Sequence, residues 1–293
     1  MKIIAFLLLF PCSMVVIAQP GNDRTAKITD TIHSKILGED RFIWLSLPDK
    51  STGNTSLKKS CPVVYVLDAE ANFNTTVEIL KQLYKTTGRQ IFSQAVVVGV
   101  GNIWERDRDY TPTHIISSPF VDSMAAKKSG GGEAFIRFME KELIPYINSK
   151  YSASSPRVLI GHSLGGLTAM NILLLHTQLF NGYAAIDPSM WWDDQKLLMQ
   201  SNTILSEGRF HNVSLFLAIA NTVNKEMNNV LEIKKDTSKK TILIRPCVTL
   251  ADYLDASKQN KLRFSWKYYK DQHHMTVYPF TTADALEFLL NTL

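Results

Sequence analysis

Short, almost uninterrupted apolar runs recur along the chain, and they constrain its fold more than any other feature. The run 62–68 reads Pro-Val-Val-Tyr-Val-Leu-Asp, and the run 95–100 reads Ala-Val-Val-Val-Gly-Val. Strands with apolar side chains on both faces are typical of a parallel sheet that is covered by helices. The predicted strands are Arg41–Leu47, Pro62–Asp68, Ala95–Val100, Arg157–Gly161, Gly182–Ile186, Val213–Ile219 and Leu262–Tyr269.

Helical patterns lie between these strands. Leu164–Leu175 is apolar nearly all round, so this helix should be buried. Strands that alternate with helices predict an α/β fold, with a mostly parallel central sheet and helices on both faces. The long connection Asn221–Asn260 should add helices that flank or cap the active site. The other predicted helices are Thr76–Tyr84, Glu133–Tyr151 and Thr282–Leu293.

The composition excludes several classes of protein. The formal net charge is +5, with 45% hydrophobic and 20% charged residues. A disordered chain would have fewer apolar residues and more charge. No basic run is dense enough to predict nucleic-acid binding, and we expect no nucleic-acid partner.

The first residues resemble a secretory signal. Lys2 precedes the uncharged stretch Ile3–Ala18, which is short for a membrane span. We expect a signal peptide over 1–18 and a single domain over 19–293. The protein should then be exported, periplasmic or secreted, without a stable membrane anchor after cleavage. The alternative is a retained anchor.

Two cysteines remain after the expected signal, Cys61 and Cys247. In an exported protein they could form a disulfide, or they could be buried and unpaired. The sequence has no CxxC and no zinc-ligand spacing, so we expect no metal and no cofactor.

The strongest chemical motif is Gly161-His162-Ser163-Leu164-Gly165, which is followed by Gly166. It lies between a predicted strand and a predicted helix, the context required for a nucleophile elbow. Glycines permit the tight turn, and the start of the helix offers N–H groups and partial positive charge to a developing oxyanion. We therefore predict Ser163 as a nucleophile.

A serine nucleophile needs a base, and in this fold the order along the chain is serine, acid, histidine. His176 and His211 come too early for that role. His273 and His274 follow the last predicted strand and precede the last helix. The order alone does not choose between these two.

The chain resembles the esterase family of α/β-hydrolases that includes the enterobactin and salmochelin esterases and the esterase D-like proteins. The resemblance implies an α/β-hydrolase fold and a base at His274, because 271–277 matches the family's Asp-x-x-His-Gly-Ser-Val run. Met275 and Thr276 replace its Gly and Ser. The similar segments are 36–41, 64–73, 106–113, 142–147, 161–166 and 188–192.

The acid is less sharply indicated. The fold places it after the strand 213–219, where Glu226 is the nearest carboxylate. Glu226 could instead be a solvated residue at a helix start. Glu232 and Asp271 are further candidates, and the resemblance also allows a Ser–His pair without an acid.

The remaining site residues belong to loops beyond the strand ends. The backbone of Leu164 should supply one oxyanion donor, and that of Ala69 or Glu70 the second. Arginines would suit an acidic or catecholate substrate and tryptophans an aromatic one. Arg108 could instead pair with Asp109 inside its loop, and the tryptophans could serve packing. The substrate-binding candidates are Trp104, Arg106, Arg108, Trp191 and Trp192.

We therefore expect a serine hydrolase that cleaves carboxylic esters of small molecules through an acyl-enzyme. The resemblance suggests siderophore-like lactones or small acyl esters as substrates. Two alternatives remain: an acyltransferase that uses the same Ser–His pair, and a non-catalytic binding protein on a hydrolase scaffold.

Overall fold

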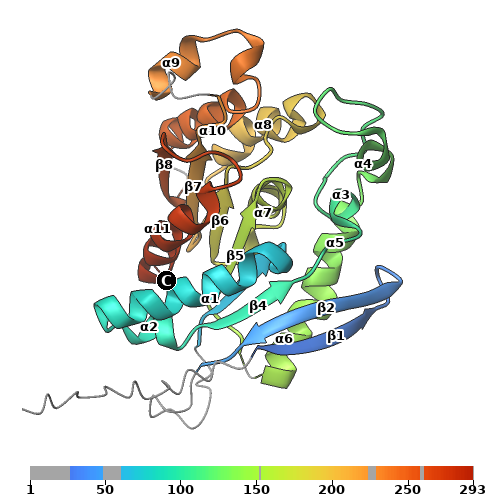
Figure 1. Ribbon diagram of the computed structural model, residues 1–293, viewed down its shortest axis with the longest axis vertical. Helices are drawn as coiled ribbons and strands as arrows, with labels where there is room; N and C mark the ends of the chain where they lie inside the picture. The colour runs from blue at the N-terminus through green and yellow to red at the C-terminus, as the bar shows by residue number, and fades with distance from the viewer. Residues whose placement is uncertain (1–26, 49–60, 152, 224–228, 258–260, 293) are drawn as a thin grey trace, which may run out of the picture.

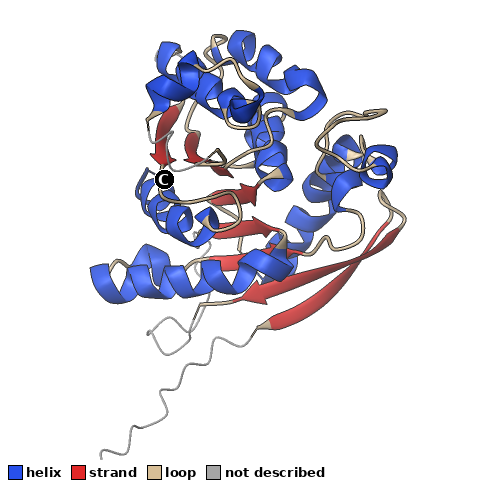
Figure 2. Cartoon of the chain, turned by 45° about the horizontal axis from the view of Figure 1, so that its top comes forward, coloured by secondary structure: helices blue, strands red, loops and turns tan. Residues whose placement is uncertain are grey.

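An eight-stranded sheet forms the centre of the protein (Figures 1 and 2). The structure, a computed structural model, describes residues 27–48, 61–151, 153–223, 229–257 and 261–292. The strand order is β1-β2-β4-β3-β5-β6-β7-β8, antiparallel from β1 to β4 and parallel from β4 to β8. The strands are β1 (Ile28–Ser34), β2 (Glu39–Ser46), β3 (Val63–Leu67), β4 (Val96–Val100), β5 (Arg157–His162), β6 (Gly182–Ile186), β7 (Ser214–Ala220) and β8 (Arg263–Tyr269).

Each predicted strand is present, and the prediction of a mostly parallel α/β sheet is confirmed. Strand β1 was not predicted. It is an edge strand paired only with β2, and of its side chains only Ile32 and Ser34 are buried. Such a strand lacks the continuous apolar run by which the buried strands were recognised.

Helices cover both faces of the sheet. On one face α1 and α11 pack against each other and against the central strands, with α2 beside α1 (Figure 1). On the other face the helices from α5 to α8, together with α10, enclose the larger part of the apolar core. These helices are α1 (Ala69–Thr87), α2 (Gln90–Ser93), α5 (Gly132–Phe138), η2 (Met139–Leu143), α6 (Ile144–Tyr151), α7 (Leu164–Leu175), α8 (Trp192–Leu205), α10 (Arg245–Ala256) and α11 (Val277–Thr292).

Helix α7 is buried as predicted, with every side chain from Leu164 to Leu174 inside the protein. Helices α1 and α11 begin earlier than predicted, at Ala69 and Val277. Helix α8 was not predicted as a helix. The shorter helical segments are α3 (Arg106–Asp109), α4 (Ser123–Lys128), η3 (Thr177–Leu179), α9 (Val230–Lys235) and η4 (Lys239–Thr241).

The long connection after β7 contains helices, as expected. Within its described part, α10 packs on α8 and on β7, and α9 packs on α10. The thiol of Cys247 in α10 donates a hydrogen bond to the carbonyl of Pro188, 3.0 Å away. This contact attaches α10 to the loop that follows β6.

Cys61 and Cys247 are both buried and free, which agrees with the unpaired alternative. No helix among the described residues is both long and apolar enough to cross a membrane. The expected signal peptide, 1–18, lies outside the described residues.

The strand order changes direction at β3. The chain runs from β3 outward to β4 and then returns to the other side of β3 as β5. In open α/β sheets the ligand site lies at the carboxyl ends of the strands near such a point. The loops after β3 and β5 are the ones that carry Asp68 and Ser163.

Candidate active site

Ser163 lies at a sharp turn between β5 and α7. Its backbone has φ 60° and ψ −120°, a conformation that is unusual for a residue with a side chain. A Cβ atom on Gly161 would lie 2.0 Å from the carbonyl oxygen of Gly165, so only glycine fits at 161. The Ser163 N–H donates to the Ile186 carbonyl (3.0 Å), and its carbonyl accepts from Leu167 N–H at 2.9 Å. The turn therefore has the geometry predicted for a nucleophile elbow.

His274 lies beside this serine. Its Nε2 is 3.0 Å from Ser163 Oγ. It belongs to the turn between β8 and α11, whereas the side chain of His273 is exposed. The structure thus brings together the serine and the histidine that the resemblance indicated.

Met275 and Thr276, which replace the family's Gly and Ser, lie in the same turn as His274. Met275 is 83% exposed. Thr276 Oγ1 accepts a hydrogen bond from His273 N–H (3.1 Å), and the N–H of Thr276 donates to the His273 carbonyl at 3.0 Å. The turn is therefore closed by its own hydrogen bonds, with the methionine side chain in solvent.

The carboxylate that contacts His274 is Asp187, which the sequence analysis missed. Its Oδ2 lies 2.6 Å from His274 Nδ1, and its Oδ1 accepts from Ala220 N–H at 2.9 Å. Asp187 is 5% exposed and directly follows β6. The carboxylate thus comes from one strand earlier than expected. Glu226 lies outside the described residues.

The two other acid candidates are exposed. Asp271 lies in the turn before the base, and Glu232 lies in the first turn of α9. The described hydrogen bonds of the His274 ring reach only Asp187 and Ser163.

These contacts define the protonation pattern of the base. An ionised carboxylate can only accept a hydrogen bond, so Nδ1 of His274 carries the proton that points to Asp187. Nε2 then has a free lone pair, which can accept the Ser163 hydroxyl proton. This is the arrangement that a general base for serine requires.

A second histidine, His162, contacts the backbone of His274. His162 Nε2 lies 2.9 Å from the backbone carbonyl of His274, and the two ring centroids are 4.5 Å apart. Burial, and then the neighbouring His274, lower the pKa of His162 to about 3. His162 is therefore neutral at ordinary pH and donates its Nε2–H to that carbonyl. No role in the site was predicted for His162 from the sequence.

The expected second oxyanion donor lies at the start of α1. The first N–H groups of a helix have no intrahelical acceptor, so those of Ala69 and Glu70 are available. The left-handed backbone falls at Asp68, φ 52°, and not at Ala69. A Cβ built on Gly165 would lie 3.5 Å from Asp68 Oδ2, which places this loop against the elbow.

Arg106 anchors the same loop. Its guanidinium donates to both carboxylate oxygens of Asp68, at 2.8 and 3.0 Å. The hydroxyl of Tyr110 accepts from Asp68 N–H at 3.1 Å. Arg106 was predicted to bind substrate, yet its described hydrogen bonds go to Asp68, which directly precedes the expected oxyanion donors Ala69 and Glu70.

Arg108 is occupied within the protein. It donates to Glu39 (2.7 and 3.2 Å) and to Asp109 at 2.7 Å, and Asp109 also accepts from buried Arg41. Burial alone would lower the pKa of Arg108, but these carboxylates outweigh it and raise that pKa above its usual value. The internal ion pair weighed in the sequence analysis is the observed arrangement.

The three tryptophans that were predicted to bind substrate have different environments. Trp104 is 81% exposed, whereas Trp192 is buried and donates from Nε1 to the Thr113 carbonyl at 3.2 Å. Trp191 is half-buried and packs edge-to-face on Phe120, with ring centroids 5.5 Å apart. Trp192 therefore has a packing role, whereas the side chains of Trp104 and Trp191 remain partly exposed to solvent.

Within the ranges that the structure describes, no group of three or more His, Cys, Asp or Glu side chains could hold a metal ion.

Comparisons with known proteins identify the family of this chain. The family described as "Putative esterase" matches residues 34–286. Ferri-bacillibactin esterase BesA of Bacillus subtilis is 27% identical over 241 residues, which cover 78% of this chain and 79% of BesA. The siderophore triacetylfusarinine C esterase of Aspergillus fumigatus is 27% identical over 182 residues, covering 57% of this chain and 58% of that protein.

Among solved structures, an IroE-like serine hydrolase from Shewanella oneidensis is 31% identical, with a TM-score of 0.79. The match covers 90% of this chain and 80% of the hydrolase. The central sheet and its helices are those of an α/β-hydrolase fold. The chain belongs to the "Putative esterase" family and is a carboxylic ester hydrolase.

Proposed function

We propose that the protein hydrolyses carboxylic esters through an acyl-enzyme on Ser163, with His274 as the base and Asp187 as its orienting acid. The observation that carries the proposal is the hydrogen-bonded row of the three side chains. Ser163 Oγ lies 3.0 Å from His274 Nε2, and His274 Nδ1 lies 2.6 Å from Asp187 Oδ2. The strained backbone at Ser163 supports it, because such strain is concentrated at functional sites.

In the first half of the reaction, Ser163 Oγ attacks the ester carbonyl carbon while its proton moves to His274 Nε2. The carbonyl oxygen gains negative charge, which the N–H groups of Leu164 and of Ala69 or Glu70 stabilise. When the tetrahedral intermediate collapses, the bond to the alcohol oxygen breaks. His274 returns its proton to that oxygen, and the alcohol departs.

In the second half, a water molecule takes the place of the alcohol. His274 accepts a proton from the water, whose oxygen attacks the acyl carbon. Collapse of this second intermediate breaks the bond to Ser163 Oγ and releases the carboxylic acid. Asp187 stabilises the imidazolium formed in each half without taking a proton itself.

The names of the relatives support a substrate class. BesA is named as a ferri-bacillibactin esterase, and the fungal relative as a siderophore triacetylfusarinine C esterase. We infer a siderophore-like lactone or another small ester as substrate. Trp104 and Trp191 are the candidates to contact it, because they expose aromatic surface in the loops after β4 and β6. Arg106 acts through Asp68, and we assign Arg108 to the internal ion pair.

The proposed cellular context rests on the sequence. An uncharged stretch at 3–18 after Lys2 supports a cleaved signal over 1–18, a single domain over 19–293, and export to the periplasm or medium.

The test is hydrolysis of p-nitrophenyl acetate and butyrate by the wild-type protein beside Ser163→Ala and His274→Ala. Each substitution should lower kcat/KM by several orders of magnitude, since each removes a group that takes part in bond making. His273→Ala is the matched control and should retain activity. Equal rates for wild type and Ser163→Ala would contradict the proposal.

A further inference from the structure

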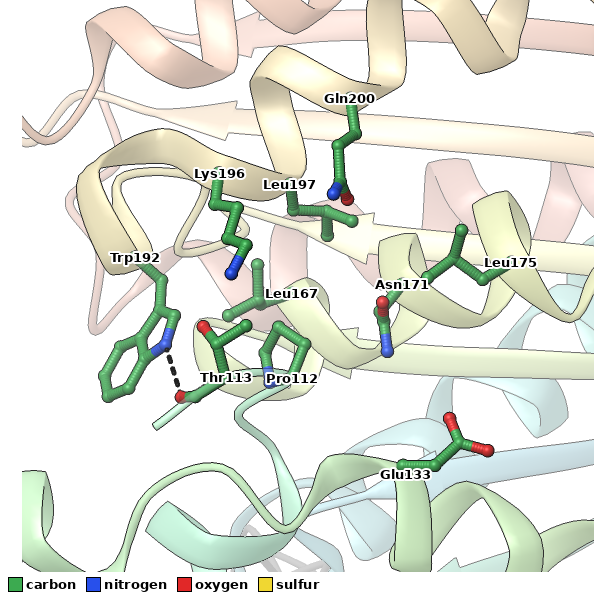
Figure 3. A pocket seen from close by; sticks show the side chains of 10 residues that line it. All are labelled: Pro112, Thr113, Glu133, Leu167, Asn171, Leu175, Trp192, Lys196, Leu197 and Gln200. Carbon is green, nitrogen blue, oxygen red and sulfur yellow. Dashed lines mark hydrogen bonds between the residues drawn. The ribbon is translucent and has the colours of Figure 1, made fainter. Parts of the chain in front are cut away.

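The nucleophile and the base of the proposed mechanism are held in different ways. Ser163 begins α7, which is buried and packs on α8; Figure 3 shows Leu167 of α7 directed toward Leu197 of α8, and both leucines are buried. His274 lies instead in the turn 270–276, most of whose side chains are exposed. Apolar packing therefore fixes the nucleophile, whereas the base depends on polar contacts. The exposed residues of the turn are Lys270, Asp271, His273, Met275 and Thr276.

Two residues at the ends of central strands donate hydrogen bonds to the backbone of this turn. Asn221, directly after β7, donates from Nδ2 to the Lys270 carbonyl (2.9 Å) and from its N–H to the Gln272 carbonyl at 2.8 Å. His162, the last residue of β5, donates from Nε2 to the His274 carbonyl at 2.9 Å. The bond from His162 is the one that reaches the backbone of the base itself.

The register of the sheet places His162 beside the acid. His162 is paired with Ile186 in β6, and Asp187 directly follows Ile186. The ends of two neighbouring strands therefore both contact the base: Asp187 lies 2.6 Å from Nδ1 of its ring, and His162 binds its carbonyl. His274 is thus held at the ring and at the main chain. These two contacts together set the direction in which Nε2 points toward Ser163 Oγ.

The side chain of His162 is itself held in place by two rings. Its centroid lies 4.5 Å from that of His274, with the two planes tilted by 36°, a spacing typical of offset-stacked rings. It also packs edge-to-face on Tyr278 in α11, with centroids 6.2 Å apart. The Tyr278 hydroxyl is hydrogen-bonded to Thr76 Oγ1 in α1, 2.9 Å away. The donor on His162 is therefore fixed relative to the helices on this face of the sheet.

The charge state of His162 suits a contact with the base. Burial, followed by the neighbouring His274, lowers the pKa of His162 to about 3, so its ring is neutral at ordinary pH. A neutral imidazole still donates from Nε2, because one of its two nitrogens carries a proton. It adds no positive charge beside His274, and so it does not oppose the imidazolium that forms there in each half of the proposed reaction.

We propose that His162 is a positioning residue for the base: its hydrogen bond to the His274 carbonyl holds Nε2 of His274 within reach of Ser163 Oγ. This inference rests on the proposed function, because it gives His162 a part in the same reaction. The described contacts of its ring are with His274 and Tyr278, so His162 acts through the base. A displacement of about 1 Å between reacting groups can lower a rate by about 100-fold, so loss of this bond should lower kcat.

The test compares three substitutions of His162 by p-nitrophenyl butyrate hydrolysis. Active sites are counted by labelling Ser163 to completion with a fluorophosphonate, so that kcat is expressed per folded site. His162→Asn is too short to reach the carbonyl and His162→Phe has no donor, so each should lower kcat about 10- to 100-fold and change KM by less than about twofold. His162→Gln carries an N–H at nearly the reach of Nε2 and should recover most of kcat. His211→Phe, an exposed histidine before β7, is the matched control and should change nothing.

The pair of amide variants separates positioning from a structural role. A purely structural role would affect His162→Asn and His162→Gln alike, and it would change the number of labelled sites rather than kcat per site. Wild-type kcat in His162→Asn and His162→Phe would overturn the inference, and so would a higher KM with unchanged kcat, which would assign His162 to substrate binding. Those results leave the proposed function standing, whereas a wild-type protein no faster than Ser163→Ala would overturn both.

Discussion

Replacing Asp187 by Asn tests how the base is oriented. The carboxylate lies 2.6 Å from His274 Nδ1 and is almost fully buried. The asparagine side chain has nearly the same shape, but its amide can donate as well as accept. The Ala220 N–H, which donates to the carboxylate at 2.9 Å, would hold the amide oxygen, so that the NH₂ group faces His274. The imidazole would then favour the tautomer with its proton on Nε2, where it can no longer accept from Ser163.

The size of the effect follows from the lost charge. A carboxylate about 4 Å from an imidazolium stabilises it by about 4 kcal/mol at the effective dielectric constant of a partly buried site. Because 1.36 kcal/mol corresponds to a factor of ten in rate, this loss alone lowers kcat by about 10³. The wrong tautomer adds to it, and the corresponding change in a serine protease lowers kcat by about 10⁴. We expect a fall of about 10³ to 10⁴.

The assay is p-nitrophenyl butyrate hydrolysis, with kcat and KM measured separately. KM should change little, since Asp187 does not contact substrate in the proposed mechanism. Glu226→Gln is the control, because this residue was the acid expected from sequence, and it should retain kcat within about threefold. Full activity in Asp187→Asn, or an equal loss of kcat in Glu226→Gln, would contradict the role of Asp187 as the orienting acid.

Four further substitutions test the surroundings of the site. The unfolding free energy should fall by about 1.4 kcal/mol per pH unit as the pH drops from about 6.5 towards 3, because His162 binds a proton in the unfolded chain that the folded protein excludes. Denaturant titrations of His162→Asn at several pH values should lack this contribution to the pH dependence. The same pH dependence in His162→Asn and wild type would contradict the prediction. Gly161→Ala should prevent folding, as seen by circular dichroism, because its Cβ would meet Gly165 O at 2.0 Å, whereas Gly165→Ala, with its nearest neighbour at 3.4 Å, should fold. Arg106→Gln should lower kcat about tenfold with less change in KM, since it releases Asp68 and the oxyanion loop; a pure KM effect would instead assign Arg106 to substrate binding.

The nucleophile could be predicted because the motif that indicates it lies within a few residues of the sequence. The turn at Ser163 requires glycine at 161, and strand, turn and helix follow one another within a few residues. His274 could be predicted from the order of elements together with the resemblance. In both cases the residues that determine the geometry lie close together in the sequence.

The acid could not be predicted in the same way, because its position depends on how strands pair. Ile186 at the end of β6 is paired with Ala218 in β7, so the loops after both strands emerge side by side. A carboxylate after either strand can therefore approach the base. The positive φ of Asp187, 42°, together with the Ala220 N–H bond, turns its side chain toward His274. Neither feature can be recognised from residue types alone.

The ion pairs of Arg106 and Arg108 could not be predicted from the sequence for the same reason. The order of charges in the run 105–109 did not reveal which arginine pairs with which carboxylate. Arg108 reaches Glu39 in β2, which is distant in sequence, and Arg106 reaches Asp68. Both pairings depend on β2, β3 and β4 being neighbours in the sheet.

Covalent labelling tests most directly whether Ser163 is the nucleophile. The protein would be treated with a fluorophosphonate, digested, and analysed by peptide mass spectrometry. We predict one adduct, on Ser163, with labelling at least about 10³-fold slower in His274→Ala because the hydroxyl then lacks its base. A protein that hydrolyses esters yet remains unlabelled at Ser163, or is labelled at another residue, would contradict the account.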